Sequence, residues 1–405
     1  MTNDKQQLIS YLRSPVAIRE RCGQLFAFVN EGKSRYFNCD LTQLTKVADY
    51  VTEVMRSEYP DLQIPFHSRW RHFEAGGVPR LTVLDNQLAG LTPVEKAAAK
   101  FDLAIVSVLL DAGAGNNWRY DEQETGLKLG RSEGLAVASL QMFCQGAFSS
   151  SNLPQVNAQK LQAFTEAELT TGFQVNAENP LVGVSGRLKL LQKLGQALFS
   201  SPNLFGNQNP RPGNLVNYLL GKSENRQLAA TTVFSAVLEG LSEIWSGRLE
   251  VAGVNLGDVW RHPAISNDGL VPFHKLSQWL TYSLLEPLQE LGLEITGLDA
   301  LTGLPEYRNG GLCIDLGLVR VKDSQIWRSP YSVASEVIVE WRALTVILLD
   351  YIAATVRENL HMSPEEMPLV KILQGGTWTA GRKIAAQLRT GGTSPIQIES
   401  DGTVF

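Results

Sequence analysis

Five carboxylates lie in apolar or turn-rich segments of this 405-residue chain. Asp111 follows the run AIVSVLL at the expected end of a helix, where the helix dipole disfavours a negative charge. Glu336 and Glu340 are four residues apart in an apolar helix, so they share a face and repel each other. Glu306 and Asp315 flank the segment YRNGGLCI. A buried carboxylate needs a partner or serves acid–base chemistry. We therefore select all five as candidate catalytic residues, with a structural role as the alternative for each.

Basic and aromatic side chains near these acids are of the types that bind an anion or a sugar. The segment HSRWRHF (67–73) places two arginines and two histidines around a tryptophan. Arg131 begins an expected helix, whose N-terminal amides can face a phosphate. The candidate binding residues are Arg69, Arg71, His72, Trp118, Arg131, His274, Lys275, Tyr282 and Arg308. A solvated basic loop and a core histidine are the alternatives for the segment 67–73 and for His274.

Several other chemistries lack a motif in the sequence. His67 and His72 are five residues apart, a spacing that fits no strong metal-binding pattern. The four cysteines show no CxxC spacing, which favours reduced core thiols. We find no P-loop, no GxGxxG after a strand and no GxSxG elbow. We therefore expect no metal and no cofactor.

Composition restricts the partners. The net charge is −5 and no basic stripe is present, which disfavours nucleic acid and anionic membranes. Only 19% of the residues are charged, so a charge inside an apolar run is more informative than usual. The sequence has no 18-residue apolar run and no N-terminal signal segment. We expect a cytoplasmic protein that is a monomer or a homodimer and has no membrane partner.

The hydrophobic pattern predicts a mainly α protein with a small β element, in a single domain over residues 1–405. Thr92, Pro93 and Glu95 form a capping box that begins a helix ending at about Gly113. Pro287 should kink or divide a helix over 271–293. Further helices are expected over 41–55, 132–146, 185–198, 332–359 and 375–388, a loop over 201–215, and strands over 247–262, over 307–323 and near the C-terminus.

The motifs resemble those of the uracil catabolism protein 4 family from about residue 15 to the C-terminus. The matching segments are HSRWRHF, LLDAGAGNNWRY, RSEGLAVASLQMF, VPFHKLSQWLTYSLLEPLQ, LTGLPEYRNGGLCID, VEWRALTVILLD and the terminal SDGTVF. The resemblance implies a place in a pathway that degrades uracil through its ribonucleotide, opens the ring and ends with urea.

Two segments also resemble the queuosine 5′-phosphate N-glycosylase family, namely TYSLLEPLQELG and SEVIVEWRALTVILLD. That resemblance implies an all-helical body related to helix-hairpin-helix DNA glycosylases. The acidic residue of that family's Asp-Tyr-Arg motif falls on Thr281 in this chain. A catalytic acid would therefore come from elsewhere in the sequence.

Together these observations predict an N-ribosyl hydrolase that releases urea from a phosphorylated riboside such as ribosylurea phosphate. Asp315 is our first choice for the general base and Asp111 the second. Arg69, Arg71, Arg131 and Lys275 would bind the phosphate, and Trp118 and Tyr282 would pack on the sugar or leaving group. One alternative is another hydrolase of the same pathway, with a metal at His67 and His72. The other is a non-catalytic scaffold or regulator, in which every embedded acid is paired.

Overall fold

The fold is known from a computed structural model that describes residues 3–399 except 112, 116, 152 and 246. The terminal motif SDGTVF lies outside the described residues. Helices dominate the described residues, as the sequence predicts. They are α1 (Asn3–Leu12), α2 (Pro15–Asn30), α3 (Leu44–Glu58), α4 (Trp70–Phe73), α5 (Arg80–Gln87), α6 (Pro93–Leu109), α7 (Arg131–Cys144), α8 (Ala158–Gln162), α9 (Glu166–Gly172), α10 (Val184–Ser200), α11 (Pro202–Phe205), α12 (Leu215–Leu220), α13 (Ala230–Leu241), α14 (Lys275–Glu290), α15 (Tyr307–Asp315), α16 (Glu336–Leu360), α17 (Leu369–Ile372) and α18 (Trp378–Leu388).

The strands are short and pair two by two. They are β1 (Phe37–Cys39) with β10 (Val319–Val321), β2 (Tyr120–Glu122) with β3 (Leu127–Leu129), β4 (Gln227–Ala229) with β9 (Glu294–Thr296), β5 (Glu250–Val251) with β6 (Val254–Asn255), β7 (Val259–Arg261) with β8 (Leu270–Pro272), and β11 (Tyr331–Ser332) with β12 (Ile398–Glu399). The β4–β9 and β11–β12 pairs are parallel and the other four are antiparallel. The strands expected within 247–262 and near the C-terminus are confirmed.

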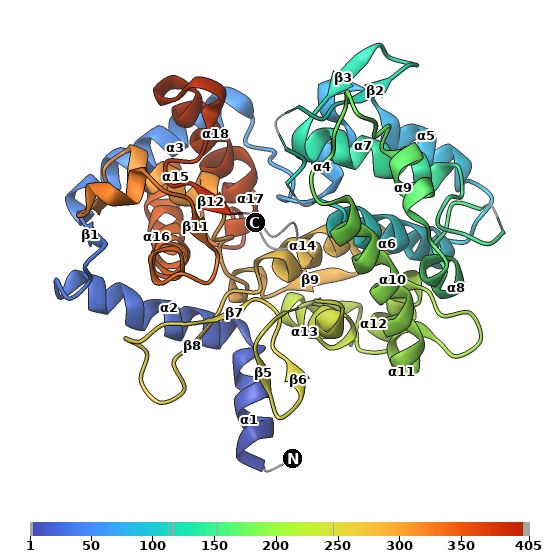
Figure 1. Cartoon of the computed structure of the whole chain (residues 1–405), viewed down its shortest axis with the longest axis horizontal. Coiled ribbons are helices and arrows are strands. Elements are labelled where there is room, and N and C mark those ends of the chain that lie inside the picture. The colour runs from blue at the N-terminus through green and yellow to red at the C-terminus, as the bar shows by residue number, and fades with distance from the viewer. Residues whose placement is uncertain (1–2, 112, 116, 152, 246, 400–405) are drawn as a thin grey trace.

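Two groups of helices flank α14 (Figure 1). On one side α2 and α3, from the start of the chain, pack with α16, and α15 packs with α18. On the other side α6 contacts α7, α12 and α14, and α13 also packs on α14. One continuous cluster of buried apolar side chains includes members of both groups. The single-domain assignment stays a prediction.

The capping box predicted before α6 is present. The Thr92 side chain accepts a hydrogen bond from the Glu95 N–H, and the Glu95 carboxylate accepts one from the Thr92 N–H. Two of the helix's free N–H groups are thereby satisfied, which fixes where α6 begins. Since α6 ends at Leu109, Asp111 lies just beyond its last turn.

The strand expected at the start of 307–323 is wrong, because residues 307–315 form α15. Only β10 at 319–321 is extended. The glycines that suggested a turn lie inside the helix. A Cβ atom on Gly310 would come within 2.7 Å of Trp341 Nε1 and 2.8 Å of Thr345 Oγ1. Glycine at this position therefore permits the close packing of α15 on α16.

Pro287 does not divide the helix, because α14 continues through Pro287 to Glu290. This helix begins at Lys275, after strand β8. The expected loop 201–215 contains the short helix α11 and one turn of 3₁₀ helix. No helix among the residues that the structure describes is long and apolar enough to span a membrane.

Candidate functional site

The segment that carries Arg69 and His72 is attached to the middle of α14. Proline has no N–H, so Pro287 leaves the carbonyl of Ser283 without its usual helical donor. The Trp70 Nε1–H donates to that carbonyl at 2.7 Å. The Arg69 N–H donates to the Ser283 hydroxyl at 2.9 Å. These two bonds fix the position of Arg69 and His72 along the axis of α14.

Arg69 is fully buried and pairs with Asp111. Its Nη1 lies 2.9 Å from Asp111 Oδ1, and its Nε donates to the Ser107 hydroxyl at 2.8 Å. The Ser132 hydroxyl, in the first turn of α7, donates to Asp111 Oδ2 at 3.1 Å. The guanidinium and the hydroxyl offset the unfavourable position of Asp111 after the end of α6. The two helices and the 67–73 segment therefore meet at this carboxylate.

Three buried nitrogen atoms around this pair have no hydrogen-bond partner among the described residues, namely Arg69 Nη2, His72 Nδ1 and Trp279 Nε1. The His72 and Trp279 rings are 5.5 Å apart and perpendicular. The Arg69 guanidinium carbon lies 5.6 Å from the Trp279 ring. Burial, together with the charge of Arg69, lowers the pKa of His72 to about 4, so its ring is neutral near pH 7. Unpaired buried polar groups are costly, so a ligand that supplies hydrogen-bond partners to these nitrogen atoms would be stabilised here.

Glu306 supplies a second carboxylate of a different kind. It caps α15, where Oε2 accepts the Arg308 N–H at 2.9 Å and Oε1 accepts the Asn309 N–H at 2.6 Å. Burial raises the pKa of Glu306, although the charges of Arg308 and Lys275 and these two bonds oppose the rise. A carboxyl held in this way can carry a proton at a higher pH than usual.

Lys275 interacts electrostatically with both Glu306 and Asp111. It is the first residue of α14, and burial lowers the pKa of its ammonium group. The negative charges of Glu306 and Asp111 both favour the charged form of Lys275. Opposite charges act in this way at short range, so the lysine lies within electrostatic reach of both carboxylates.

Trp378, at the start of α18, completes the surroundings. Its ring lies 5.9 Å from the His72 ring, and the guanidinium carbons of Arg308 and Arg382 each lie 4.9 Å from its centre. Arg382 also pairs with Glu133 at 2.7 Å. We call the set Arg69, His72, Asp111, Lys275, Trp279, Glu306, Arg308 and Trp378 the central cluster. It joins α14 to both helical groups.

The other three predicted catalytic carboxylates bind partners away from the central cluster. Asp315 ends α15 and accepts two hydrogen bonds from Arg389, at 2.7 and 2.6 Å. Glu340 is buried, accepts the Ser34 hydroxyl at 2.6 Å and lies 3.2 Å from His262 Nε2. Glu336 is half-buried near the surface, where the Tyr36 hydroxyl donates to it at 3.2 Å. These partners all lie outside the central cluster.

Five of the predicted binding residues also have partners in the fold. Arg71 pairs with Glu286 at 2.7 Å, and the exposed Arg131 donates to the Gly391 carbonyl at 2.9 Å. Trp118 is buried with its Nε1–H on the Phe173 carbonyl at 2.9 Å. The buried Tyr282 hydroxyl donates to the Thr302 carbonyl at 3.1 Å, and His274 is buried against Leu12.

Two tryptophans of the cluster and a carboxylate beside it were not predicted from the sequence. Trp279 and Trp378 lie in segments that were treated as ordinary helix. Asp258 accepts Arg342 on both oxygens, at 2.8 and 2.7 Å, and also accepts the Trp260 Nε1–H and the Lys275 N–H. The only sequence signal was its position between Gly257 and an apolar strand. Across the described residues, no three His, Cys, Asp or Glu side chains are arranged to hold a metal.

Comparison with known proteins gives a consistent family. The family model described as protein of unknown function (DUF1688) matches residues 11–405. Uracil catabolism protein 4 of Lachancea kluyveri is 40% identical, over 98% of this chain and 99% of its own length. Protein urg3 of Schizosaccharomyces pombe is also 40% identical, with the same coverage. The chain therefore belongs to the DUF1688 family, together with uracil catabolism protein 4.

Proposed function

We propose that this protein acts in uracil catabolism and hydrolyses the N-glycosidic bond of a ring-opened pyrimidine nucleotide such as ribosylurea phosphate. The name of the Lachancea kluyveri relative supports the pathway. The observation that carries the reaction is the central cluster, where two carboxyls in unlike environments lie near one lysine and three unpaired nitrogen atoms. Two carboxyls that take the separate roles of acid and base are the usual pair in glycoside hydrolysis.

Glu306 is suited to be the general acid. Its raised pKa keeps a proton available for the nitrogen that leaves C1′. As the C1′–N bond breaks, that nitrogen takes the bonding electron pair and the proton, and urea departs. The sugar then carries positive oxocarbenium charge.

Asp111 is suited to stabilise that charge and to act as the base. Arg69 and Ser132 hold its carboxylate in place. A water molecule attacks C1′ and loses its proton to Asp111, which gives ribose phosphate. This assignment places the base at the second choice of the sequence analysis, because both oxygens of Asp315 already bind Arg389.

The cations and nitrogen atoms of the cluster are suited to the sugar phosphate. Arg308 and Lys275 provide positive charge beside Glu306. Arg69 Nη2 and Trp279 Nε1 are donors without partners among the described residues, so they can bind phosphate or hydroxyl oxygen atoms. No step in this scheme requires a cofactor.

Urea release tests the proposal. Purified protein is incubated with synthetic ribosylurea phosphate, and free urea and ribose phosphate are measured over time. We expect equal amounts of both products, and strong loss in Asp111→Asn and Glu306→Gln. The absence of urea release, with no release of base from other nucleoside phosphates, would contradict the proposal.

A scaffold role is the second candidate, because several embedded acids have an arginine partner. Asp102 pairs with Arg211, and Asp315 pairs with Arg389. A scaffold would bind a pathway enzyme and leave ribosylurea phosphate unchanged. The same urea assay, run beside a binding measurement with purified pathway enzymes, separates the two functions.

A further inference from the structure

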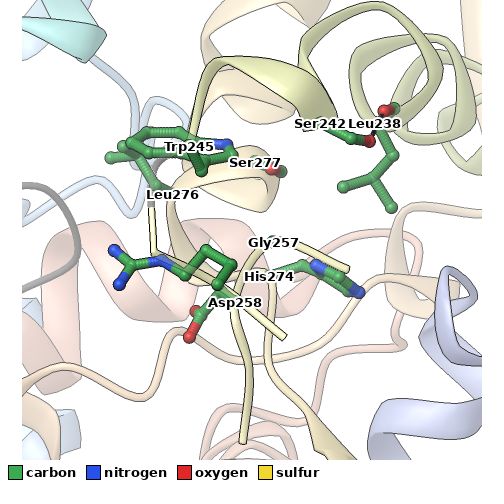
Figure 2. Close-up of a pocket in the computed structure, with 9 residues that line it drawn as sticks. Leu238, Ser242, Trp245, Gly257, Asp258, His274, Leu276 and Ser277 are labelled. Carbon is green, nitrogen blue, oxygen red and sulfur yellow. Dashed lines mark hydrogen bonds between the residues drawn. The ribbon is translucent and has the colours of Figure 1, made fainter. Parts of the chain in front are cut away.

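A separate pocket lies at the N-terminal end of α14, between α13 and the turn before β7 (Figure 2). It holds about 360 Å³ of space without protein atoms, part of which opens to solvent. Trp245 and Leu276 lie on one side and Leu238 and Ser242 on another, with His274 below them in the view (Figure 2). The walls are thus mainly apolar, with a histidine in the lining.

The protonation state of His274 follows from its partner. Its Nε2 lies 2.9 Å from the carbonyl oxygen of Leu12, which can only accept, so Nε2 carries the hydrogen. Burial lowers the pKa of His274, and the ring is neutral. Nδ1 therefore presents a lone pair. The residue is only 1% exposed, and Nδ1 has no hydrogen-bond partner among the residues described.

The gap beside Nδ1 is about as wide as one small group. Gly257 borders it, and a Cβ atom added there would lie 3.8 Å from His274 Nδ1 and 3.9 Å from Trp245 Cδ1. Both distances are ordinary van der Waals contacts, so a side chain at position 257 would extend into the space beside Nδ1 that glycine leaves open. The nearby Asp258 already accepts four hydrogen bonds, including two from Arg342. The missing bond is therefore one donor to Nδ1.

We propose that this pocket binds a small, neutral, planar group that donates an N–H to His274 Nδ1, of the amide or ureido class. An ammonium ion fits poorly because Arg248 also lines the pocket and Asp258, the acid in the lining, is already bonded to Arg342. A carboxylate or phosphate has no hydrogen to donate to the lone pair.

The position of the pocket gives this group a role that rests on the proposed function. Asp258 lines the pocket and accepts the N–H of Lys275, whose side chain senses the charges of Glu306 and Asp111. The pocket and the central cluster therefore share the first turn of α14. In the proposed reaction the ureido leaving group is the part of the substrate with this chemistry.

Two substitutions at His274 separate its two nitrogen atoms. In His274→Gln, the side-chain amide can reach the Leu12 carbonyl but leaves no acceptor at the Nδ1 position. In His274→Asn, the shorter side chain can place its oxygen near Nδ1 and loses the Leu12 contact. Asparagine also suits the left-handed backbone of His274, where φ is 47°.

Binding is measured by ligand-detected NMR with N-methylurea as the probe and methyl acetate, which lacks an N–H, as the matched control. We expect wild type and His274→Asn to bind N-methylurea, and His274→Gln to bind about tenfold more weakly. Methyl acetate should bind none of them measurably. Gly257→Ala, which fills the gap, should also abolish binding. Because the φ of Gly257 is 68°, this variant is checked by the same thermal unfolding control as His274→Gln.

Equal binding of N-methylurea to wild type, His274→Gln and Gly257→Ala would overturn the inference, as would equal binding of methyl acetate. A lack of N-methylurea binding to wild type would indicate a water site only, and would also overturn it. The urea-release assay is independent of this result. Turnover without probe binding defeats the pocket alone, whereas probe binding without turnover defeats the proposed reaction alone.

Discussion

Two buried arginine–carboxylate pairs near the start of α14 differ in how completely they are bonded. Asp258 accepts four hydrogen bonds, and Arg342 also lies 4.1 Å from the centre of the Phe273 ring. Arg69, beside Asp111, keeps one nitrogen without a partner among the described residues, and so do His72 and Trp279 next to it. The same residue types thus make a closed structural pair in one place and an open, ligand-ready one in the other.

Breaking the closed pair should have the largest effect. Arg342→Met leaves the Asp258 carboxylate buried without its cation, which typically costs about 3–5 kcal/mol. The free energy of unfolding is measured by guanidinium denaturation. Arg320→Met, at the more exposed Asp40–Arg320 pair, is the control and should have a much smaller effect. A similar cost for the two variants would show that the Asp258–Arg342 pair is not special.

In the open pair, the expected loss is in turnover. Asp111→Asn keeps the shape of the side chain but removes the base, so kcat/KM for urea release should fall about 100-fold or more. The Ser132 contact can remain, but the buried Arg69 loses its counter-charge, so the variant should be less stable and its kinetics are measured well below its unfolding transition. Activity within threefold of wild type would exclude Asp111 as the base.

The acid in the open site should leave a signature in the pH profile. The pKa of Glu306 is raised, so its folded form keeps a proton above the usual range and loses it as pH increases. For a general acid, kcat/KM should therefore decline as pH rises through that raised pKa. The stability of the protein should change with pH in the same direction. The folded state binds the Glu306 proton more tightly than the unfolded state, so the contribution of Glu306 to the free energy of unfolding decreases as pH rises from the unfolded pKa through the folded pKa.

Glu306→Gln removes that titration. We expect a lower rate and the loss of the alkaline decline that Glu306 causes. A variant whose pH profile keeps the wild-type shape would assign the decline to another group.

The smallest effect is expected at Asp315, whose partner Arg389 is partly exposed. Asp315→Asn should reduce the free energy of unfolding by about 1–3 kcal/mol, because the Asp315 carboxylate is nearly buried, and leave turnover within about twofold of wild type. Steady-state kinetics and denaturation of the same preparation test both values. A 100-fold loss of turnover would restore Asp315 as the base that the sequence analysis placed first.

Local signals in the sequence predicted the helices well. All the residues of the capping box before α6 lie within four consecutive positions, and the box is present in the structure. The strand predicted at 307–315 was wrong because a Gly-Gly pair usually marks a turn. Here Gly310 permits α15 to pack closely on Trp341, which is 31 positions away in the sequence. A local sequence pattern cannot indicate a contact at that separation.

The candidate site could be predicted in residue type but not in pairing. Embedded acids and nearby cations were selected by their residue type, but their partners are remote in sequence. Arg342 meets Asp258 across 84 positions, and Arg389 meets Asp315 across 74. Asp111 also has an arginine partner, but Arg69 keeps one nitrogen without a partner among the described residues, so only the fold distinguishes Asp111 from the paired Asp315.

The attachment of the 67–73 segment to Ser283 has a consequence for the order of folding. Arg69 and Ser283 are 214 residues apart, so the chain must close a very long loop before their bond forms. Contacts of such separation form slowly compared with helices. We therefore expect helical structure to appear early during refolding, and ligand binding at the central cluster to return in a later phase that Ser283→Ala slows.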